Sequence, residues 1–177
     1  ARTALERMAR LVTQLLTLAR LEGVASDTGE ALDLAELARD VCGEWADKAV
    51  ARDIDLSLAA EPAPFTGESE GLRILLRNLL DNALRYTPAG GRVEVAVSPG
   101  DTRSGPLLRV ADSGPGIAPD RRHELGRRFH RLQPAGPDGV GLGLSIVLRI
   151  AERHGARTTF GSGLDGSGLG VEVRFPR

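Results

Sequence analysis

The sequence predicts an α+β fold, a two-layer α/β sandwich in which three main helices cover a mixed, mostly antiparallel sheet, preceded by one long helix. Long segments carry apolar residues at helical spacing, and shorter segments read as strands. Turns rich in Gly and Pro separate these segments. A chain of 177 residues with 41% hydrophobic content is also large enough to bury a core between two layers.

The first predicted element is a helix over residues 5–22. Alternating spacings of three and four define its apolar stripe, which consists of Leu5, Met8, Val12, Leu15 and Ala19. The stripe is wide for a lone helix, so we expect it to pack against partners in a helical hairpin or four-helix bundle. An ordinary core helix is the alternative. Small and polar residues over 23–31 predict a linker, which places the main domain at residues 32–177.

The main domain is predicted to begin with a helix and a strand, over 34–51 and 54–58. A second helix follows over 68–86, where leucines keep helical spacing until Pro88 and two glycines stop it. Two strands come next, over 92–97 and 107–112.

The C-terminal third is predicted to start with a short helix over 121–125 and a mobile loop that reaches residue 138. A helix over 143–154 ends at Gly155. Two last strands, over 157–161 and 170–175, complete the sheet.

Charge and cysteine content exclude several classes of protein. The net charge of −1 does not provide the strong basic field that nucleic-acid binding normally requires, so we expect no nucleic-acid partner. A single cysteine, Cys42, excludes an intrachain disulfide and a thiolate metal cage. The longest uncharged stretch, ten residues from Gly139 to Leu148, is too short to span a bilayer.

Polar side chains gather on one face of the helix over 68–86. Asn78, Asn82 and Arg85 are separated by four and three residues, so they share a narrow sector at the edge of the leucine stripe. Neutral amide oxygens suit Mg²⁺ that is held jointly with phosphates and water. The alternative is that both asparagines are rim or capping residues.

Two glycine-rich segments follow this helix along the chain. Asp112 ends an apolar strand and opens the segment DSGPGI, where it could accept a hydrogen bond from an exocyclic amine; a plain Gly-Pro turn is the alternative. The segment GVGLGL, residues 139–144, precedes an apolar helix and places unpaired N–H groups where a phosphate can bind. Leu144 and Ile146 break the dinucleotide fingerprint, and a P-loop is absent because the only lysine is Lys48.

Four segments, taken in order, identify a family. They are LLRNLLDNALRYTP, DSGPGI, RRFHRL and GVGLGLSIV. They resemble the N, G1, F and G2 boxes of the sensor histidine kinases, within the wider family that includes the Hsp90, gyrase and MutL ATPases. The segment RLVTQLLTLARLE resembles the second helix of the dimerisation and histidine-phosphotransfer hairpin. The C-terminal part most resembles the QseC-like kinases.

The resemblance implies a Bergerat-type ATP site with Mg²⁺. Asn82 would be the principal metal ligand with Asn78 beside it, and Arg85 and Tyr86 would approach the phosphates or ribose. Asp112 would bind the adenine amine, in a pocket shaped by Gly114, Gly116 and Ile117. Phe129 would anchor a lid and Arg131 would face phosphate, so that the catalytic roles fall on Asn78 and Arg131. The hinge and phosphate-binding helix entry would be Gly139, Val140, Gly141, Leu142, Gly143 and Leu144.

Two positions depart from the family pattern and one motif is missing. Gly126 replaces the first Phe of the F box, which leaves lid anchoring to Phe129, and Ser113 replaces a frequent Asn. None of the three histidines has the context of the phosphoacceptor H box. We therefore expect the phosphoacceptor helix to lie outside the sequence, and the chain to bind nucleotide without phosphorylating itself.

The resemblance implies the catalytic core of a bacterial sensor histidine kinase, on the cytoplasmic side of an inner-membrane protein. Its partners would be ATP, the phosphoacceptor His helix of its own homodimer and a response regulator. One rival is an ATP-hydrolysing member of the wider family, but its general base, a Glu, is replaced by Asn78, which cannot remove a proton from water. The other rival is a scaffold that has lost nucleotide affinity.

Overall fold

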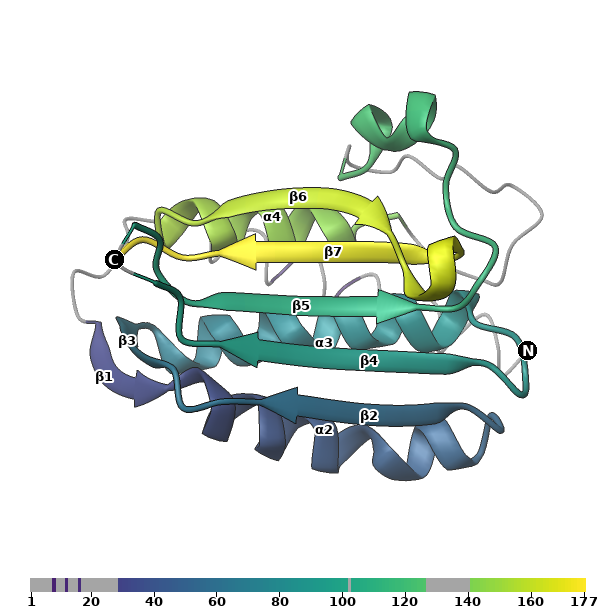
Figure 1. The fold of residues 1–177 in the computed structure, drawn as a ribbon, viewed down its shortest axis with the longest axis horizontal. Coiled ribbons are helices and arrows are strands. Elements are labelled where there is room, and N and C mark those ends of the chain that lie inside the picture. Colours follow the sequence, from purple (N-terminus) through teal and green to yellow (C-terminus); the bar gives the residue numbers. More distant parts are fainter. Residues whose placement is uncertain (1–7, 9–11, 13–15, 17–28, 102, 127–140) are drawn as a thin grey trace.

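The computed structural model describes residues 29–101, 103–126 and 141–177, together with the single residues 8, 12 and 16. In this part of the chain, the helices α2, α3 and α4 lie on one face of a five-stranded sheet, as Figure 1 shows. The predicted two-layer sandwich is therefore confirmed. No helix among these residues is long and apolar enough to cross a bilayer.

Each helix buries the stripe that the sequence predicts. In α2 (Leu34–Val50) and α3 (Ser69–Tyr86), the buried positions repeat every three or four residues. The Asp33 side chain caps α2, because its Oδ1 accepts the N–H of Ala35 at 2.8 Å and also that of Ala63 at 2.9 Å. These two backbone hydrogen bonds lower the pKa of Asp33. The shorter α4 (Gly143–Arg153) packs against α3.

The sheet has the order β2-β4-β5-β7-β6. Only β2 (Asp55–Ala60) and β4 (Arg92–Ser98) are parallel, and α3 lies in the connection between them. The pairs of β4 with β5 (Leu107–Asp112), β5 with β7 (Leu169–Arg174) and β7 with β6 (Arg157–Ser162) are antiparallel. The last strand of the chain, β7, therefore lies between two strands that precede it.

Two short strands were not predicted. They are β1 (Glu30–Asp33) and β3 (Pro64–Gly67), which pair antiparallel at the edge of the domain. Each has four residues, too few to show an alternating pattern. The short helix predicted over 121–125 is the 3₁₀ helix η1 (Pro119–Glu124). A second 3₁₀ turn, η2 (Leu164–Gly166), joins β6 to β7.

Of the helix predicted over 5–22, the described residues are Met8, Val12 and Leu16. They are helical, and 54–69% of each residue is exposed. A spacing of four places them on one face of a helix. Whether this face packs in a helical bundle, and where the domain boundary lies, stay predictions.

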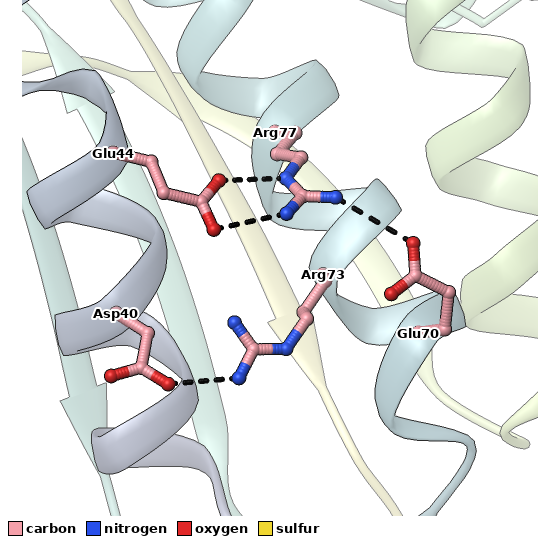
Figure 2. A network of polar contacts seen from close by, with 5 residues as sticks. All are labelled: Asp40, Glu44, Glu70, Arg73 and Arg77. Carbon is pink, nitrogen blue, oxygen red and sulfur yellow. Dashed lines mark hydrogen bonds and ion pairs between the residues drawn. The ribbon is translucent and has the colours of Figure 1, made fainter.

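A network of ion pairs joins the outer sides of α2 and α3 (Figure 2). Arg77 makes two hydrogen bonds of 3.0 Å to the Glu44 carboxylate, and its third nitrogen lies 3.5 Å from Glu70. Arg73 donates to Asp40 at 2.8 Å. The network therefore ties α3 to α2 through Arg73 and Arg77. Asn78, the residue after Arg77, faces the start of α4 instead.

Replacing Glu44 by Gln should lower the melting temperature slightly at pH 7 in low salt, because the pair is half exposed. The hydrogen bonds from Arg77 lower the pKa of Glu44 below its ordinary value of 4.5. The stabilisation is therefore present above the unfolded pKa and is lost as the pH falls through the folded one. The difference between wild type and Glu44→Gln should shrink in high salt and below pH 4.5. An equal loss in the control Glu61→Gln, an exposed loop residue, would contradict this expectation.

Candidate functional site

Asn78 of α3 lies beside the first residue of α4. Its Nδ2 donates to the carbonyl of Ile74 at 2.8 Å, which fixes the orientation of the amide. Its Oδ1 would lie only 3.3 Å from a Cβ atom added to Gly143. A neutral amide oxygen, a type of ligand that suits Mg²⁺, thus lies next to the start of α4. Asn82 is half-buried one turn further along α3.

Arg85 and Tyr86 end α3 close to the other predicted site residues. Arg85 pairs with Asp81 one turn earlier, and only 11% of its side chain is exposed. The carbonyl of Tyr86 would lie 2.7 Å from a Cβ atom on Gly114, so a side chain at that position would collide with the end of the helix. The C-terminal end of α3 therefore touches the glycine-rich loop that follows β5.

Asp112 is the last residue of β5, and only 4% of it is exposed. Its Oδ1 accepts two backbone N–H groups, from Gly114 at 2.8 Å and from Leu169 at 3.2 Å. Burial raises the pKa of Asp112, and these two hydrogen bonds oppose the rise. Among the described residues both of these hydrogen bonds go to Oδ1, so Oδ2 keeps its acceptor capacity for a ligand.

Residues 112–117, which we name the Asp112 loop, continue from that carboxylate. Gly116 has φ +70°, a conformation that favours glycine. Ile117 packs against the hydrophobic core, and its carbonyl accepts the Nε–H of Arg122 at 3.1 Å. The loop is thus fixed at both ends, at Asp112 and at η1.

The start of α4 presents backbone N–H groups without partners in the helix. Leu142 is fully buried, and its carbonyl accepts the N–H of Ile146 and the hydroxyl of Ser145. Gly143 and Leu144 then lie in the first turn, which contains no acidic residue. Such a helix start attracts an anion. Gly141, with φ +76°, precedes it.

The structure brings the described site residues together at two contacts of α3. The C-terminal ends of β5 and α3 meet at Gly114, and α3 meets the start of α4 at Asn78. Figure 1 shows the tip of β5 and the end of α3 at the same end of the molecule. Four predicted site residues, Phe129, Arg131, Gly139 and Val140, lie outside the described residues.

The sequence did not predict the part that Gly163, Gly168 and Leu169 play in holding Asp112. Leu169 contributes a backbone N–H, which any residue type could supply. The two glycines allow the main chain to pass close to Asp112. The only signal in the sequence is their position in a turn rich in glycine.

A groove of about 780 Å³ lies at the opposite end of the sheet and includes none of the predicted site residues. His154 lines it and joins α4 to α3. Its Nδ1 lies 2.8 Å from the carbonyl of Ile150, and its Nε2 accepts the N–H of Glu68 at 3.0 Å. His154 therefore caps the start of α3 from the end of α4.

The backbone at Gly126 favours glycine, at the position where the resemblance to the F box would place Phe. Its φ is +81°, and an added Cβ atom would lie 2.1 Å from Cδ1 of Leu148. Gly126→Ala should therefore lower the free energy of unfolding by about 1 kcal/mol or more. Gly43→Ala is the matched control, since Gly43 is exposed in α2 with open space around it, and it should gain about 0.5–1 kcal/mol. Urea unfolding measures both, and a Gly126→Ala variant as stable as wild type would refute the expectation.

Residues 67–177 match the family model described as "Histidine kinase-, DNA gyrase B-, and HSP90-like ATPase". The sensor protein kinase PmrB of Pseudomonas aeruginosa is 43% identical over 176 residues, which are 98% of this chain and 36% of PmrB. The chain thus spans about a third of the length of the curated relatives it matches.

Two solved structures are also similar. The cytoplasmic segment of histidine kinase QseC has a TM-score of 0.66 and 31% identity, over 96% of this chain and 93% of that one. Full-length ShkA in complex with AMPPNP has a TM-score of 0.83 and 30% identity, over 99% of this chain and 37% of that one. The fold of the chain is therefore that of these kinases.

Proposed function

Because the chain belongs to the histidine kinase-, DNA gyrase B- and HSP90-like ATPase family, among the sensor histidine kinases, we propose that it binds ATP with Mg²⁺ and donates the γ-phosphoryl group to a histidine. The observation that carries this proposal is that α3 contacts both parts of the candidate site. The amide of Asn78 lies next to the start of α4, and the carbonyl of Tyr86 lies next to Gly114, in the loop that begins at the buried Asp112 carboxylate.

Asp112 would recognise the base. Its Oδ1 is occupied by the N–H groups of Gly114 and Leu169, so Oδ2 is the acceptor for the exocyclic amine of adenine. Gly114 and Gly116 lack the Cβ atoms that would collide with the carbonyls of Tyr86 and Gly168, so the loop that would shape the adenine pocket can take this closely packed course. Ile117, the last residue of the loop, is held through its carbonyl by Arg122.

The start of α4 would bind the phosphates. Its N–H groups and the positive end of its dipole favour a bound anion. Arg85 would approach the phosphates or ribose from the end of α3. Arg131 and Phe129 keep their proposed roles as a phosphate contact and the lid anchor, and Gly139 and Val140 keep theirs in the hinge.

The donor set beside α4 fits Mg²⁺. The oxygen of Asn78 lies next to Gly143, and Asn82 follows one turn along the same helix. Both are neutral oxygen donors, which suit a cation whose charge is matched by phosphates. When bound, Mg²⁺ would neutralise charge on the phosphates and hold them in position.

The transfer itself would be an in-line displacement. A nitrogen of the acceptor imidazole attacks the γ-phosphorus, the N–P bond forms, and the bond to the bridging oxygen breaks as ADP leaves. The side chains of this site contribute by positioning and by charge. Asn78 cannot act as a general base for water, which supports transfer over hydrolysis. In the whole protein we propose passage of the phosphoryl group to an aspartate of a response regulator.

Titration of the chain with AMPPNP and Mg²⁺ in a calorimeter tests nucleotide binding. Saturable binding is expected, and its absence from well-folded protein would contradict the proposal and favour a scaffold. The whole protein of which this chain is part, incubated with ATP labelled on the γ-phosphate, tests transfer. Protein-bound label that is stable to alkali and released by acid is expected for phosphohistidine; free labelled phosphate with no bound label would indicate an ATPase.

A further inference from the structure

The connection between β6 and β7 reaches the Asp112 carboxylate from outside the four sequence motifs. We name residues 163–168 the β6–β7 turn; it contains η2 and leads directly into Leu169 of β7. Figure 1 shows this turn curled at the same end of the sheet as the tip of β5. The turn therefore lies at the candidate site although it is outside the four segments that identify the family.

Two hydrogen bonds join the end of the turn to the Asp112 loop. The Ser167 hydroxyl donates to the carbonyl of Gly114 at 2.9 Å. Two residues later, the N–H of Leu169 donates to Oδ1 of Asp112 at 3.2 Å. The N–H of Gly114 donates to the same Oδ1 at 2.8 Å. Ser167 thus holds Gly114 in place, and the N–H groups of Gly114 and Leu169 hold the Asp112 carboxylate.

The main chains of the turn and the loop are also in direct contact. A Cβ atom on Gly168, which has φ +70°, would lie 1.8 Å from the carbonyl oxygen of Asp112. One on Gly163 would lie 2.0 Å from that same oxygen. One on Gly116 would lie 2.4 Å from the carbonyl oxygen of Gly168. Loop and turn therefore pack as one unit with no side chain between them.

The first residue of β4 holds both segments. Arg92 forms an ion pair with Asp165 in the turn. Its backbone N–H donates to the Ser113 hydroxyl at 2.8 Å, and its carbonyl accepts the Ser113 N–H at 3.0 Å. The turn and the Asp112 loop are thus anchored to the same point of the sheet.

We infer that the β6–β7 turn positions Asp112 for recognition of the base, and that the Ser167 hydroxyl is the side-chain group responsible for this positioning. The inference rests on the proposed nucleotide binding. Recognition of adenine requires Oδ2 of Asp112 to face the amine, which in turn requires Oδ1 to stay on its two N–H donors. Guanine carries an oxygen at the position of that amine, and an oxygen facing a carboxylate is repelled. A carboxylate held in one orientation therefore selects adenine, and one that is free to rotate selects less well.

Ser167→Ala tests this role by nucleotide selectivity. The dissociation constant for AMPPNP with Mg²⁺ should rise about tenfold, the usual size of one lost hydrogen bond. The constants for GMPPNP, measured by competition, and for inorganic tripolyphosphate should change less than about twofold, because the start of α4 is untouched. Ser167→Thr keeps the hydroxyl and should restore the AMPPNP constant. Ser57→Ala, an exposed serine on β2, is the control and should match wild type.

The same measurements distinguish the possible failures. An AMPPNP constant that is unchanged in Ser167→Ala, or equal losses for AMPPNP, GMPPNP and tripolyphosphate, would overturn the positioning role. A wild-type chain that binds AMPPNP and GMPPNP equally would overturn it too, because then no selectivity depends on Asp112. Failure of folded wild type to bind AMPPNP at all would refute the proposed function itself.

Discussion

Asp112→Asn should weaken AMPPNP binding about 100-fold or more, without unfolding the chain. The two N–H groups of Gly114 and Leu169 keep an oxygen at the Oδ1 position, so the new amide must place its NH₂ group where Oδ2 was. A donor then faces the exocyclic amine of adenine, which is also a donor. Calorimetric titration measures the loss.

The stability of this variant is the internal control. Burial raises the pKa of Asp112, which means that the ionised carboxylate destabilises the fold near neutral pH. A neutral amide of the same shape removes this cost, so the melting temperature should equal or exceed that of wild type. Nucleotide binding by wild type should weaken on acidification at a pH above the ordinary aspartate value of 3.8. Retained affinity in Asp112→Asn would refute the base contact.

Asn82→Ala should remove the part of AMPPNP affinity that depends on Mg²⁺. The variant loses the amide oxygen that we propose as the principal metal ligand, while the N–H groups of α4 still bind phosphate. Wild type should therefore bind more tightly with Mg²⁺ than with EDTA, by about tenfold or more, and the variant should bind equally in both.

Alanine favours a helix interior more than asparagine does, so Asn82→Ala should not lower the melting temperature. A loss of binding can then be assigned to the site. If the variant keeps the full response to Mg²⁺, the amide of Asn82 is no ligand and the metal contact lies elsewhere.

The long helices were predictable because each carries its own periodic signal. The leucines of α3 recur over more than three turns, so one misread position could not hide the pattern. The strands β1 and β3 have four residues each, and Pro64 and Gly67 of β3 are poor strand residues. The two strands pair with each other, and Asp33 of β1 binds both the start of α2 and the residue before β3. Their existence depends on tertiary contacts that no local pattern records.

The sequence points to a site residue where the side chain itself has recognisable chemistry, as in Asn78, Asn82 and Asp112. The structure places Asn78 next to the start of α4 and Asp112 at the end of β5, and their roles in binding stay predictions. The N–H of Leu169 has no residue type attached to it, and the role of Ser167 depends on a carbonyl more than 50 residues away. Such contacts become visible only once β6 and β7 are placed beside β5.

The position of β7 has a consequence for synthesis on the ribosome. β5 lacks one of its two neighbours until the last strand emerges, about sixty residues later, because β7 lies between β5 and β6. At about 5–20 residues per second this interval is roughly 3 to 12 s, during which one edge of β5 has no strand to pair with. During the same interval, the Oδ1 atom of Asp112 lacks the N–H donor that Leu169 provides. The candidate nucleotide site is therefore complete only after β7 has been synthesised, so a nascent chain stalled before β7 should be unable to bind nucleotide.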